Sequence, residues 1–342
     1  MDIRQSLSLL ADGRDLSLDE MKGVMGQVMS GKATDAQIGA FLMAMRLKGE
    51  TLDEITAAVM VMRELATGVS ITGEHVMDIV GTGGDGANLF NVSTAATFVV
   101  AAGGGQVAKH GNRSVSSSCG SADVLEAAGI HLGLEPEQVA ACVEELGVGF
   151  MFAPAHHSAM RHAIGPRKEL GVRTIFNILG PMTNPAGVKR LLIGVYDQAL
   201  CRPVAEVLGR LGARHAMVVH SADGLDEISS AAPTFVAEVK DGELREFEFR
   251  PEDIGLVRTG LDGLEVTTVA DSLELIQAAL SGAGGDRAQR ARQIVALNAG
   301  AALYVAGLQD SIRDGVQLSL SLLESGAPWQ KMEALAAFTA SF

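Results

Sequence analysis

The segment Met77-Asp-Ile-Val-Gly-Thr-Gly-Gly-Asp-Gly86 decides the fold class of this 342-residue chain. A short, mainly apolar run at 77–80 leads into a glycine-rich loop, and an alanine-rich helical stretch begins at Ser93. The same alternation continues along the chain. Further strands are predicted at 107–109, 147–151, 191–195 and 216–220, and further helices at 123–128, 137–146 and 200–211. Alternating strands and helices indicate an α/β fold with a largely parallel sheet.

The first 70 residues carry helix signals instead. Ser17, Thr34 and Thr51 each precede a Glu or Gln by three positions, which is the pattern of a capping box. Apolar residues follow each box at the spacing of one helix face. This part of the chain therefore predicts three amphipathic helices that each bury one stripe.

The chain is expected to form two domains. Residues 1–70 predict a small all-helical domain, to which the Pro- and Gly-punctuated segment at about 165–187 contributes. Residues 71–342 predict a larger α/β domain with a mostly parallel central sheet. Within it, two alternating runs around Asp241-Gly242 predict a hairpin with a type I′ turn, and four helices are expected after about Asp271.

Composition excludes several classes of protein. The net charge of −14 argues against a nucleic-acid partner, because phosphates attract a basic surface. The uncharged run 91–108 is broken by glycines and does not indicate a membrane span. Three cysteines without metal-type spacing, and an N-terminus without a signal-peptide pattern, favour a reduced, cytoplasmic location.

An acid-free window follows the quoted segment. No Asp or Glu occurs from Gly86 to Ala122, despite the acidic balance of the whole chain. Glycines let backbone N–H groups approach phosphate oxygens, and the residues around Ser93 stand where a helix N-terminus favours an anion. Lys109 and Arg113 add two cations after a predicted strand. The window therefore predicts a phosphate-binding cradle.

Simpler interpretations of the window stay open. Gly81-x-Gly83-x-x-Gly86 matches a dinucleotide fingerprint, but the acidic residue expected about 20 positions later is missing. A Walker loop would need Gly-Lys-Ser/Thr, which is also absent. The glycines are also consistent with an ordinary turn, and 109–113 with a solvated basic turn.

Two further groups are candidates for ligand binding. Asp226 and Glu227 follow a predicted strand, and adjacent carboxylates at a strand end suit Mg²⁺, which prefers oxygen ligands and often bridges to phosphates. Their alternative is an acidic surface turn. Arg167 carries a planar guanidinium that matches a carboxylate, and its alternative is a surface ion pair.

Taken in order, these motifs resemble the anthranilate phosphoribosyltransferase family over nearly the whole chain. The matching stretches are 81–86, 91–94, 109–117, 120–123, 173–185 and 224–229. The resemblance implies a homodimer with a nucleoside phosphorylase/phosphoribosyltransferase-like fold. It also implies Mg²⁺-dependent transfer of phosphoribose from phosphoribosyl pyrophosphate to the amine of anthranilate, which releases pyrophosphate in the second step of tryptophan biosynthesis from chorismate.

The resemblance also implies which residues bind each ligand. Phosphoribosyl pyrophosphate would be held by Gly81, Gly84, Asp85, Asn91, Val92, Ser93, Thr94, Lys109, His110, Gly111, Asn112, Arg113, Ser114, Val115, Ser116, Ser117 and Ser121. Anthranilate would be held by Gly81, Asn112 and Arg167, and Mg²⁺ by Ser93, Asp226 and Glu227. No catalytic residue is assigned, although His110 could accept the amine proton.

Two departures from the family pattern and three rival functions remain. Leu89 replaces a usual hydroxyl residue, and Ser118-Cys119 replaces Lys-Ser, so weaker binding of phosphoribosyl pyrophosphate is expected. A pyrimidine nucleoside phosphorylase would share the architecture. An NAD-dependent dehydrogenase and a non-catalytic anion-binding paralogue are the alternatives from other classes.

Overall fold

The computed structural model describes residues 1–113 and 119–342, and it divides into two compact units. One unit comprises Met1–Gly68 and Pro154–Gly187, and the other comprises Val69–Ala153 and Val188–Phe342. The second segment of the smaller unit thus starts at Pro154, before the expected 165. Each unit is described by itself below.

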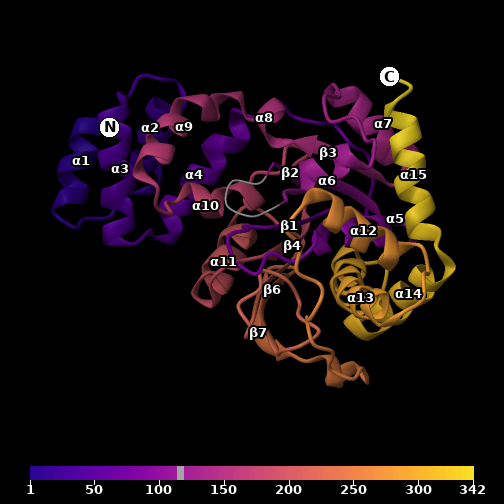
Figure 1. Ribbon diagram of the computed structural model, residues 1–342. Helices are drawn as coiled ribbons and strands as arrows, with labels where there is room; N and C mark the ends of the chain where they lie inside the picture. Colours follow the sequence, from indigo (N-terminus) through magenta and orange to yellow (C-terminus); the bar gives the residue numbers. More distant parts are fainter. Residues whose placement is uncertain (114–118) are drawn as a thin grey trace. The chain divides into compact units, whose positions relative to one another are not determined.

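The smaller unit consists of helices (Figure 1). Its elements are α1 (Ile3–Ala11), α2 (Leu18–Met29), α3 (Asp35–Lys48), α4 (Leu52–Glu64), α8 (Ala153–His156, which begins at the boundary), η1 (Ser158–Met160), α9 (Arg161–Leu170), α10 (Phe176–Leu179) and η2 (Gly180–Met182). The three helices predicted from capping boxes are confirmed as α2, α3 and α4, each with both reciprocal hydrogen bonds of its box. Helix α1, capped by Asp2, was not predicted.

The larger unit is built on one seven-stranded sheet in the order β3-β2-β1-β4-β5-β6-β7. Its strands are β1 (Val76–Gly81), β2 (Gln106–Gly111), β3 (Val148–Phe152), β4 (Arg190–Gly194), β5 (His215–Ser221), β6 (Thr234–Lys240) and β7 (Glu243–Phe249). The first five are parallel, and β6 and β7 pair antiparallel, so the mostly parallel sheet is confirmed. Asp241 and Gly242 join β6 to β7 with φ of 49° and 87°, as a type I′ turn requires.

Helices pack around this sheet (Figure 1). They are α5 (Val92–Ala102), α6 (Ser121–Ala127), α7 (Pro136–Leu146), η3 (Gln198–Leu200), α11 (Cys201–Arg210), η4 (Pro251–Ile254), α12 (Val269–Leu280), α13 (Asp286–Ala306), α14 (Ile312–Ser325) and α15 (Ala327–Thr339). Helices α5 and α13 pack against each other and against β1. Helices α13 and α14 cross at Gly300 and Gly315, where a Cβ on Gly300 would lie 2.4 Å from Cγ2 of Val316.

The strand order changes direction at β1. The chain passes from β1 to β2 and β3 on one side, and then returns to β4 and β5 on the other. In open α/β sheets, ligands bind at such a switch point, outside the carboxyl ends of the strands. The loops that follow β1, β4 and β5 therefore define where a site is expected.

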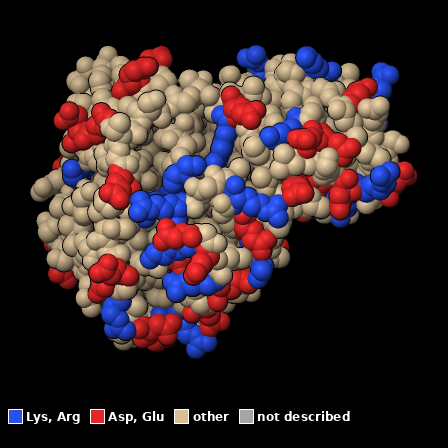
Figure 2. Space-filling model, turned by 180° about the vertical axis from the view of Figure 1, so that it is seen from behind, with Lys and Arg blue, Asp and Glu red and all other residues tan. Residues whose placement is uncertain are grey.

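The surface carries charges of both signs, and the three cysteines are buried. Figure 2 shows acidic and basic side chains next to one another across the face it presents. No helix within 1–113 and 119–342 is long and apolar enough to cross a membrane. Cys119, Cys142 and Cys201 are buried and form no disulfide.

One capping residue of the smaller unit is fully buried. Glu54 has no exposed surface and accepts hydrogen bonds from the N–H of Thr51 at 2.8 Å and of Leu16 at 2.9 Å. Its other partner is the ammonium of Lys48 at 2.8 Å, also in an ion pair with Asp15. Glu54 therefore joins the first turn of α4 to the segment before α2.

Glu54→Ala should destabilise the protein by about 3–5 kcal/mol, because it leaves the buried N–H of Leu16 without this acceptor and Lys48 with the exposed Asp15 as its remaining ion-pair partner. Thermal unfolding followed by circular dichroism would measure the loss. Glu20 holds the same position in the box of Ser17, where it accepts the Ser17 N–H at 2.9 Å at the surface. Glu20→Ala is the matched control and should cost much less. Equal losses would show that burial of Glu54 is not what matters.

Candidate active site

The glycine loop lies at the carboxyl end of β1. Gly83, Gly84 and Gly86 have φ of 65°, 77° and 78°, a left-handed conformation that favours glycine. The N–H of Gly83 donates to Oδ2 of Asp226 at 2.7 Å. The loop is thus tied directly to the acidic pair predicted as a metal site.

Helix α5 begins at this edge of the sheet. Asn91 is its N-cap residue, and the Asn91 side chain donates to the carbonyl of Cys119 and accepts from the hydroxyl of Ser272. In the first turn, the N–H of Ser93 donates to Oε1 of Glu227 at 3.1 Å. The N-terminus of this 11-residue helix carries a partial positive charge that favours anions. Asn91 and Ser93 thus lie at the N-terminus of a helix, as predicted. One of the N–H groups of its first turn, that of Ser93, is already bonded to Glu227.

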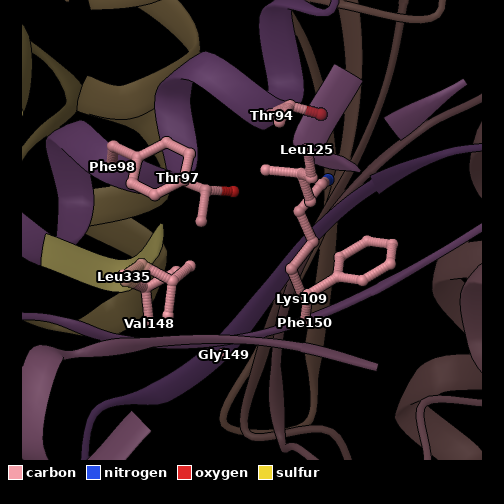
Figure 3. A pocket seen from close by; sticks show the side chains of 9 residues that line it. All are labelled: Thr94, Thr97, Phe98, Lys109, Leu125, Val148, Gly149, Phe150 and Leu335. Atoms are coloured by element: carbon pink, nitrogen blue, oxygen red, sulfur yellow. The ribbon is translucent and has the colours of Figure 1, made fainter. Parts of the chain in front are cut away.

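Lys109 brings a buried cation to the same place. Its side chain is only 3% exposed, and Nζ donates to the carbonyl of Ile79 at 2.5 Å and to the hydroxyl of Ser93 at 3.5 Å. Figure 3 shows its aliphatic stem beside Phe150, at a void of about 10 Å³. Burial lowers the pKa of Lys109, while the negative charges of Asp78 and Glu227 oppose that change.

Thr94 leaves one polar atom without a partner at this void. Its Oγ1 is buried and makes no hydrogen bond to the residues that the structure describes. The same void is lined by Lys109. The Thr94 hydroxyl therefore has unused hydrogen-bonding capacity, and its contact with phosphate stays a prediction.

Asp226 and Glu227 follow β5 and are partly buried. Burial, and then the charge of Asp85, raises the pKa of Asp226 to about 7. Burial, and then the charge of Asp226, raises the pKa of Glu227 to about 8. The carboxylates repel one another in a poorly solvated place, which a cation would relieve.

These oxygens fit an open Mg²⁺ site better than a closed one. Within 1–113 and 119–342, no group of three His, Cys, Asp or Glu side chains has the geometry of a metal site. Mg²⁺ is commonly held by one or two carboxylates together with substrate phosphates. The oxygen atoms of Asp226, Glu227 and the Ser93 hydroxyl are of the kind that Mg²⁺ binds, and their role as its ligands stays a prediction.

Asn298 of α13 fixes the backbone directly after Asp226 and Glu227. Its Oδ1 accepts the N–H of Ile228 at 2.9 Å, and its Nδ2 donates to the carbonyl of Ile228 at 2.9 Å. Asn298 was not predicted as part of the site. An isolated Asn in the apolar run of a helix was a usable signal, because buried polar groups need hydrogen-bond partners.

The basic segment is less open than the sequence suggested. Arg113 forms ion pairs with Glu126 at 2.8 Å and Asp123 at 3.0 Å, and hydrogen bonding to Glu126 and then to Asp123 raises the pKa of its guanidinium. Binding a phosphate through Arg113 would have to compete with these two carboxylates. Ser121 donates to the carbonyl of Asn112 at 3.4 Å, next to Gly111 at the end of β2. Ser114, Val115, Ser116, Ser117 and Ser118 lie outside the described residues.

His110 and Leu89 lie in the larger unit, and Arg167 lies in the smaller one. His110 is buried, and its backbone N–H donates to Oδ1 of Asp78 at 3.2 Å. Leu89 packs against the hydrophobic core. In its own unit, Arg167 stacks over the ring of Phe176 at 5.2 Å, and burial lowers the pKa of its guanidinium. The ligand-binding roles of these three residues stay predictions.

Comparison with known families defines the class. A model of the glycosyl transferase family's helical bundle domain matches residues 4–66, and a model of its a/b domain matches residues 73–328. Together with the fold and the acidic pair beside a glycine loop, these matches define a glycosyltransferase with a helical and an α/β domain.

Individual relatives narrow the class. The chain is 63% identical to an anthranilate phosphoribosyltransferase of Marinobacter nauticus over the full length of both, and 61% identical to one of Saccharophagus degradans over 99% of this chain and 100% of the other. A crystal structure of the Thermus thermophilus enzyme superposes with a TM-score of 0.92 at 41% identity, covering 99% of this chain and 100% of that one. This chain belongs to the anthranilate phosphoribosyltransferases.

Family membership decides between the functions considered above. The chain is an enzyme that transfers phosphoribose from phosphoribosyl pyrophosphate to the amine of anthranilate. The dehydrogenase, phosphorylase and non-catalytic alternatives are thereby set aside. A more distant structure, the Saccharomyces cerevisiae enzyme in complex with PRPP and Mg, has the same fold at 23% identity, with a TM-score of 0.87 over 99% of this chain and 98% of that one.

The raised carboxyl pKa values imply a dependence of stability on pH. Asp226 binds its proton more tightly in the folded protein than at its ordinary pKa of 3.8, so its contribution to stability falls as pH rises toward about 7. In metal-free protein, Asp226→Asn should therefore raise Tm more at about pH 8 than at about pH 5.

Differential scanning calorimetry at the two pH values would measure this change. Asp310→Asn, at an exposed position, is the control and should leave the pH dependence of Tm unaltered. A rise in Tm of equal size at both pH values would contradict the electrostatic explanation for Asp226.

Proposed function

We propose that phosphoribosyl transfer takes place at the carboxyl edge of the sheet, between the glycine loop, the first turn of α5 and the acidic pair. The observation that carries this proposal is a set of two hydrogen bonds. The N–H of Gly83 meets Asp226 at 2.7 Å, and the N–H of Ser93 meets Glu227 at 3.1 Å. They join backbone donors, which suit phosphate, to carboxylates, which suit Mg²⁺.

The departure of pyrophosphate requires that this edge of the sheet stabilise negative charge. Pyrophosphate departs as negative charge develops on it, so donors and cations fixed beforehand lower the barrier. Lys109 and the N-terminus of α5 supply positive charge, and the glycine loop supplies N–H groups at close range. Mg²⁺, when bound by Asp226, Glu227 and Ser93, would supply further charge to the pyrophosphate oxygens. Support comes from the yeast enzyme, which is known in complex with PRPP and Mg.

Anthranilate needs a partner for its carboxylate and a place for its amine proton. We assign the carboxylate to Arg167, whose planar guanidinium fits it in two-pronged fashion, with Gly81 and Asn112 as further contacts. The amine attacks C1 of the ribose and loses a proton, for which His110 is the candidate acceptor. The yeast enzyme in complex with 4-fluoroanthranilate supports an aromatic acid as the acceptor substrate.

Two departures from the family pattern would weaken binding without changing the reaction. Leu89 offers no hydroxyl for a phosphate contact. Ser118-Cys119 stands where the family pattern has Lys-Ser, so the basic segment has one cation fewer for phosphate. We therefore propose a higher KM for phosphoribosyl pyrophosphate than in relatives with the usual residues.

The reaction is tested by the fluorescence of anthranilate. With Mg²⁺ and phosphoribosyl pyrophosphate, the purified protein should consume that fluorescence. Glu227→Gln should raise the Mg²⁺ concentration for half-maximal rate by about tenfold or more, because a carboxylate ligand is lost. Glu324→Gln, at an exposed position of α14, is the matched control and should behave as wild type.

Two outcomes would count against this assignment. Stable fluorescence together with phosphate-dependent cleavage of pyrimidine nucleosides would favour a phosphorylase. Unchanged Mg²⁺ dependence in Glu227→Gln would remove Glu227 from the metal site while leaving the transferase activity in place.

We further propose that the chain forms a homodimer through the smaller unit. Among the described residues, five of the seven exposed large hydrophobic side chains lie in that unit: Met1, Leu47, Leu65, Ile164 and Val172. The larger unit contributes only Val257 and Phe342. Exposed apolar side chains are thus more numerous on the smaller unit, and we place the proposed association surface there on that ground. The three thiols without disulfides support a cytoplasmic location.

Leu47→Asp should shift the protein from dimer to monomer, because it places a charge in the apolar surface. Light scattering coupled to size-exclusion chromatography would measure the mass. Val257→Asp is the matched control, since Leu47 and Val257 are both 80% exposed and lie in different units. A monomeric wild type, or dissociation by Val257→Asp alone, would refute this interface.

A further inference from the structure

Two glycines end neighbouring strands at the switch point of the sheet. Gly81 of β1 and Gly194 of β4 are register partners, and Gly194 also pairs with Val219 of β5. Gly194 is not among the positive-φ residues, so its conformation does not require glycine. Its lack of a side chain needs another explanation.

Asp226 occupies the space that side chains at these two positions would fill. A Cβ on Gly194 would lie 1.5 Å from the carbonyl oxygen of Asp226 and 2.5 Å from its carbonyl carbon. A Cβ on Gly81 would lie 2.4 Å from Oδ2 of the same residue. The contact of Gly81 is with the end of a side chain, which can rotate. The contact of Gly194 is with backbone, which must move as a whole.

The surroundings of this contact are fixed. The N–H of Thr82 donates to the carbonyl of Gly194 at 2.9 Å, and the hydroxyl of Thr82 accepts the N–H of Tyr196 at 3.0 Å. These bonds hold the ends of β1 and β4 together. Two residues after Asp226, the backbone N–H and carbonyl of Ile228 are both hydrogen-bonded to the side chain of Asn298. The acidic segment therefore has little freedom to retreat from a larger residue at Gly194.

We propose that Gly194 is a positioning residue for the metal-binding carboxylates. Its missing side chain lets the backbone of Asp226 rest on β4, which sets where the Asp226 and Glu227 side chains meet Gly83 and Ser93. The inference rests on the proposed role of these carboxylates in holding Mg²⁺. It predicts that added bulk at Gly194 disturbs metal binding selectively, beyond any general loss of stability.

Gly194→Ala is the direct test, with Gly300→Ala as a matched steric control. A Cβ on Gly300 would lie 2.4 Å from Cγ2 and 2.5 Å from the backbone N of Val316, so that variant suffers a similar clash in the contact of α13 with α14. Two readouts are needed: the Mg²⁺ concentration for half-maximal rate, and the Mg²⁺ concentration for the half-maximal rise in Tm at fixed phosphoribosyl pyrophosphate.

Both Mg²⁺ concentrations should rise by about 10- to 100-fold in Gly194→Ala, as when a residue that orients a metal ligand is lost. Gly300→Ala should lower Tm but leave both concentrations unchanged. Equal Mg²⁺ dependence in Gly194→Ala and Gly300→Ala would overturn the proposal. If wild type shows no Mg²⁺ effect in either readout, the proposed metal role fails instead.

Thr82→Val keeps the test decisive if Gly194→Ala does not fold. It removes the hydroxyl that accepts the Tyr196 N–H, so the ends of β1 and β4 loosen without any clash. Both Mg²⁺ concentrations should rise by up to about tenfold, and Thr82→Ser should restore them because it keeps the hydroxyl. Wild-type Mg²⁺ dependence in Thr82→Val would show that the strand ends do not position Asp226.

Discussion

The parallel pairing of β1 with β4 is the constraint on which the rest of this structure depends. It runs from Asp78 opposite Leu191 to Gly81 opposite Gly194, so both strands end side by side. Because β5 is parallel to β4, the segment after β5 arrives at the same edge. A glycine loop and an acidic pair more than 140 positions apart in the chain are thereby joined by a hydrogen bond of 2.7 Å.

Burying each charged side chain at this edge of the sheet alone would cost free energy, and opposite charges close by reduce that cost. Lys109 is buried, which lowers its pKa, and the carboxylate of Glu227 works against that effect. Glu227 in turn is buried beside Asp226 and gains from the N–H of Ser93. The proposed phosphate and Mg²⁺ would add both a negative and a positive partner to these charges. The acids of this edge come from a segment outside the acid-free window.

Local signals in the sequence predicted local structure well. A capping box such as that of Thr34 needs only residues three positions apart, and it forms as predicted. The position of the acidic pair after β5 was also predicted, because a strand followed by carboxylates is a local pattern, and its role as a metal site stays a prediction. Asn298 and the space above Gly194 were missed, because each depends on a partner about 30 to 70 positions away. The Arg113 ion pairs were missed for a different reason, since acids just beyond the acid-free window turn back onto it.

The resemblance of 81–86 to a dinucleotide fingerprint can now be explained physically. In that fingerprint, the glycines make a tight turn and let the backbone approach a pyrophosphate. Here the first glycine, Gly81, also leaves room for a carboxylate oxygen of Asp226, which a Cβ would meet at 2.4 Å. A carboxylate at this point would repel a bare pyrophosphate, whereas the proposed Mg²⁺ would attract both groups. On that proposal, the same spacing of glycines serves a different ligand, and Asp226, the residue that distinguishes the two cases, lies in the loop after β5.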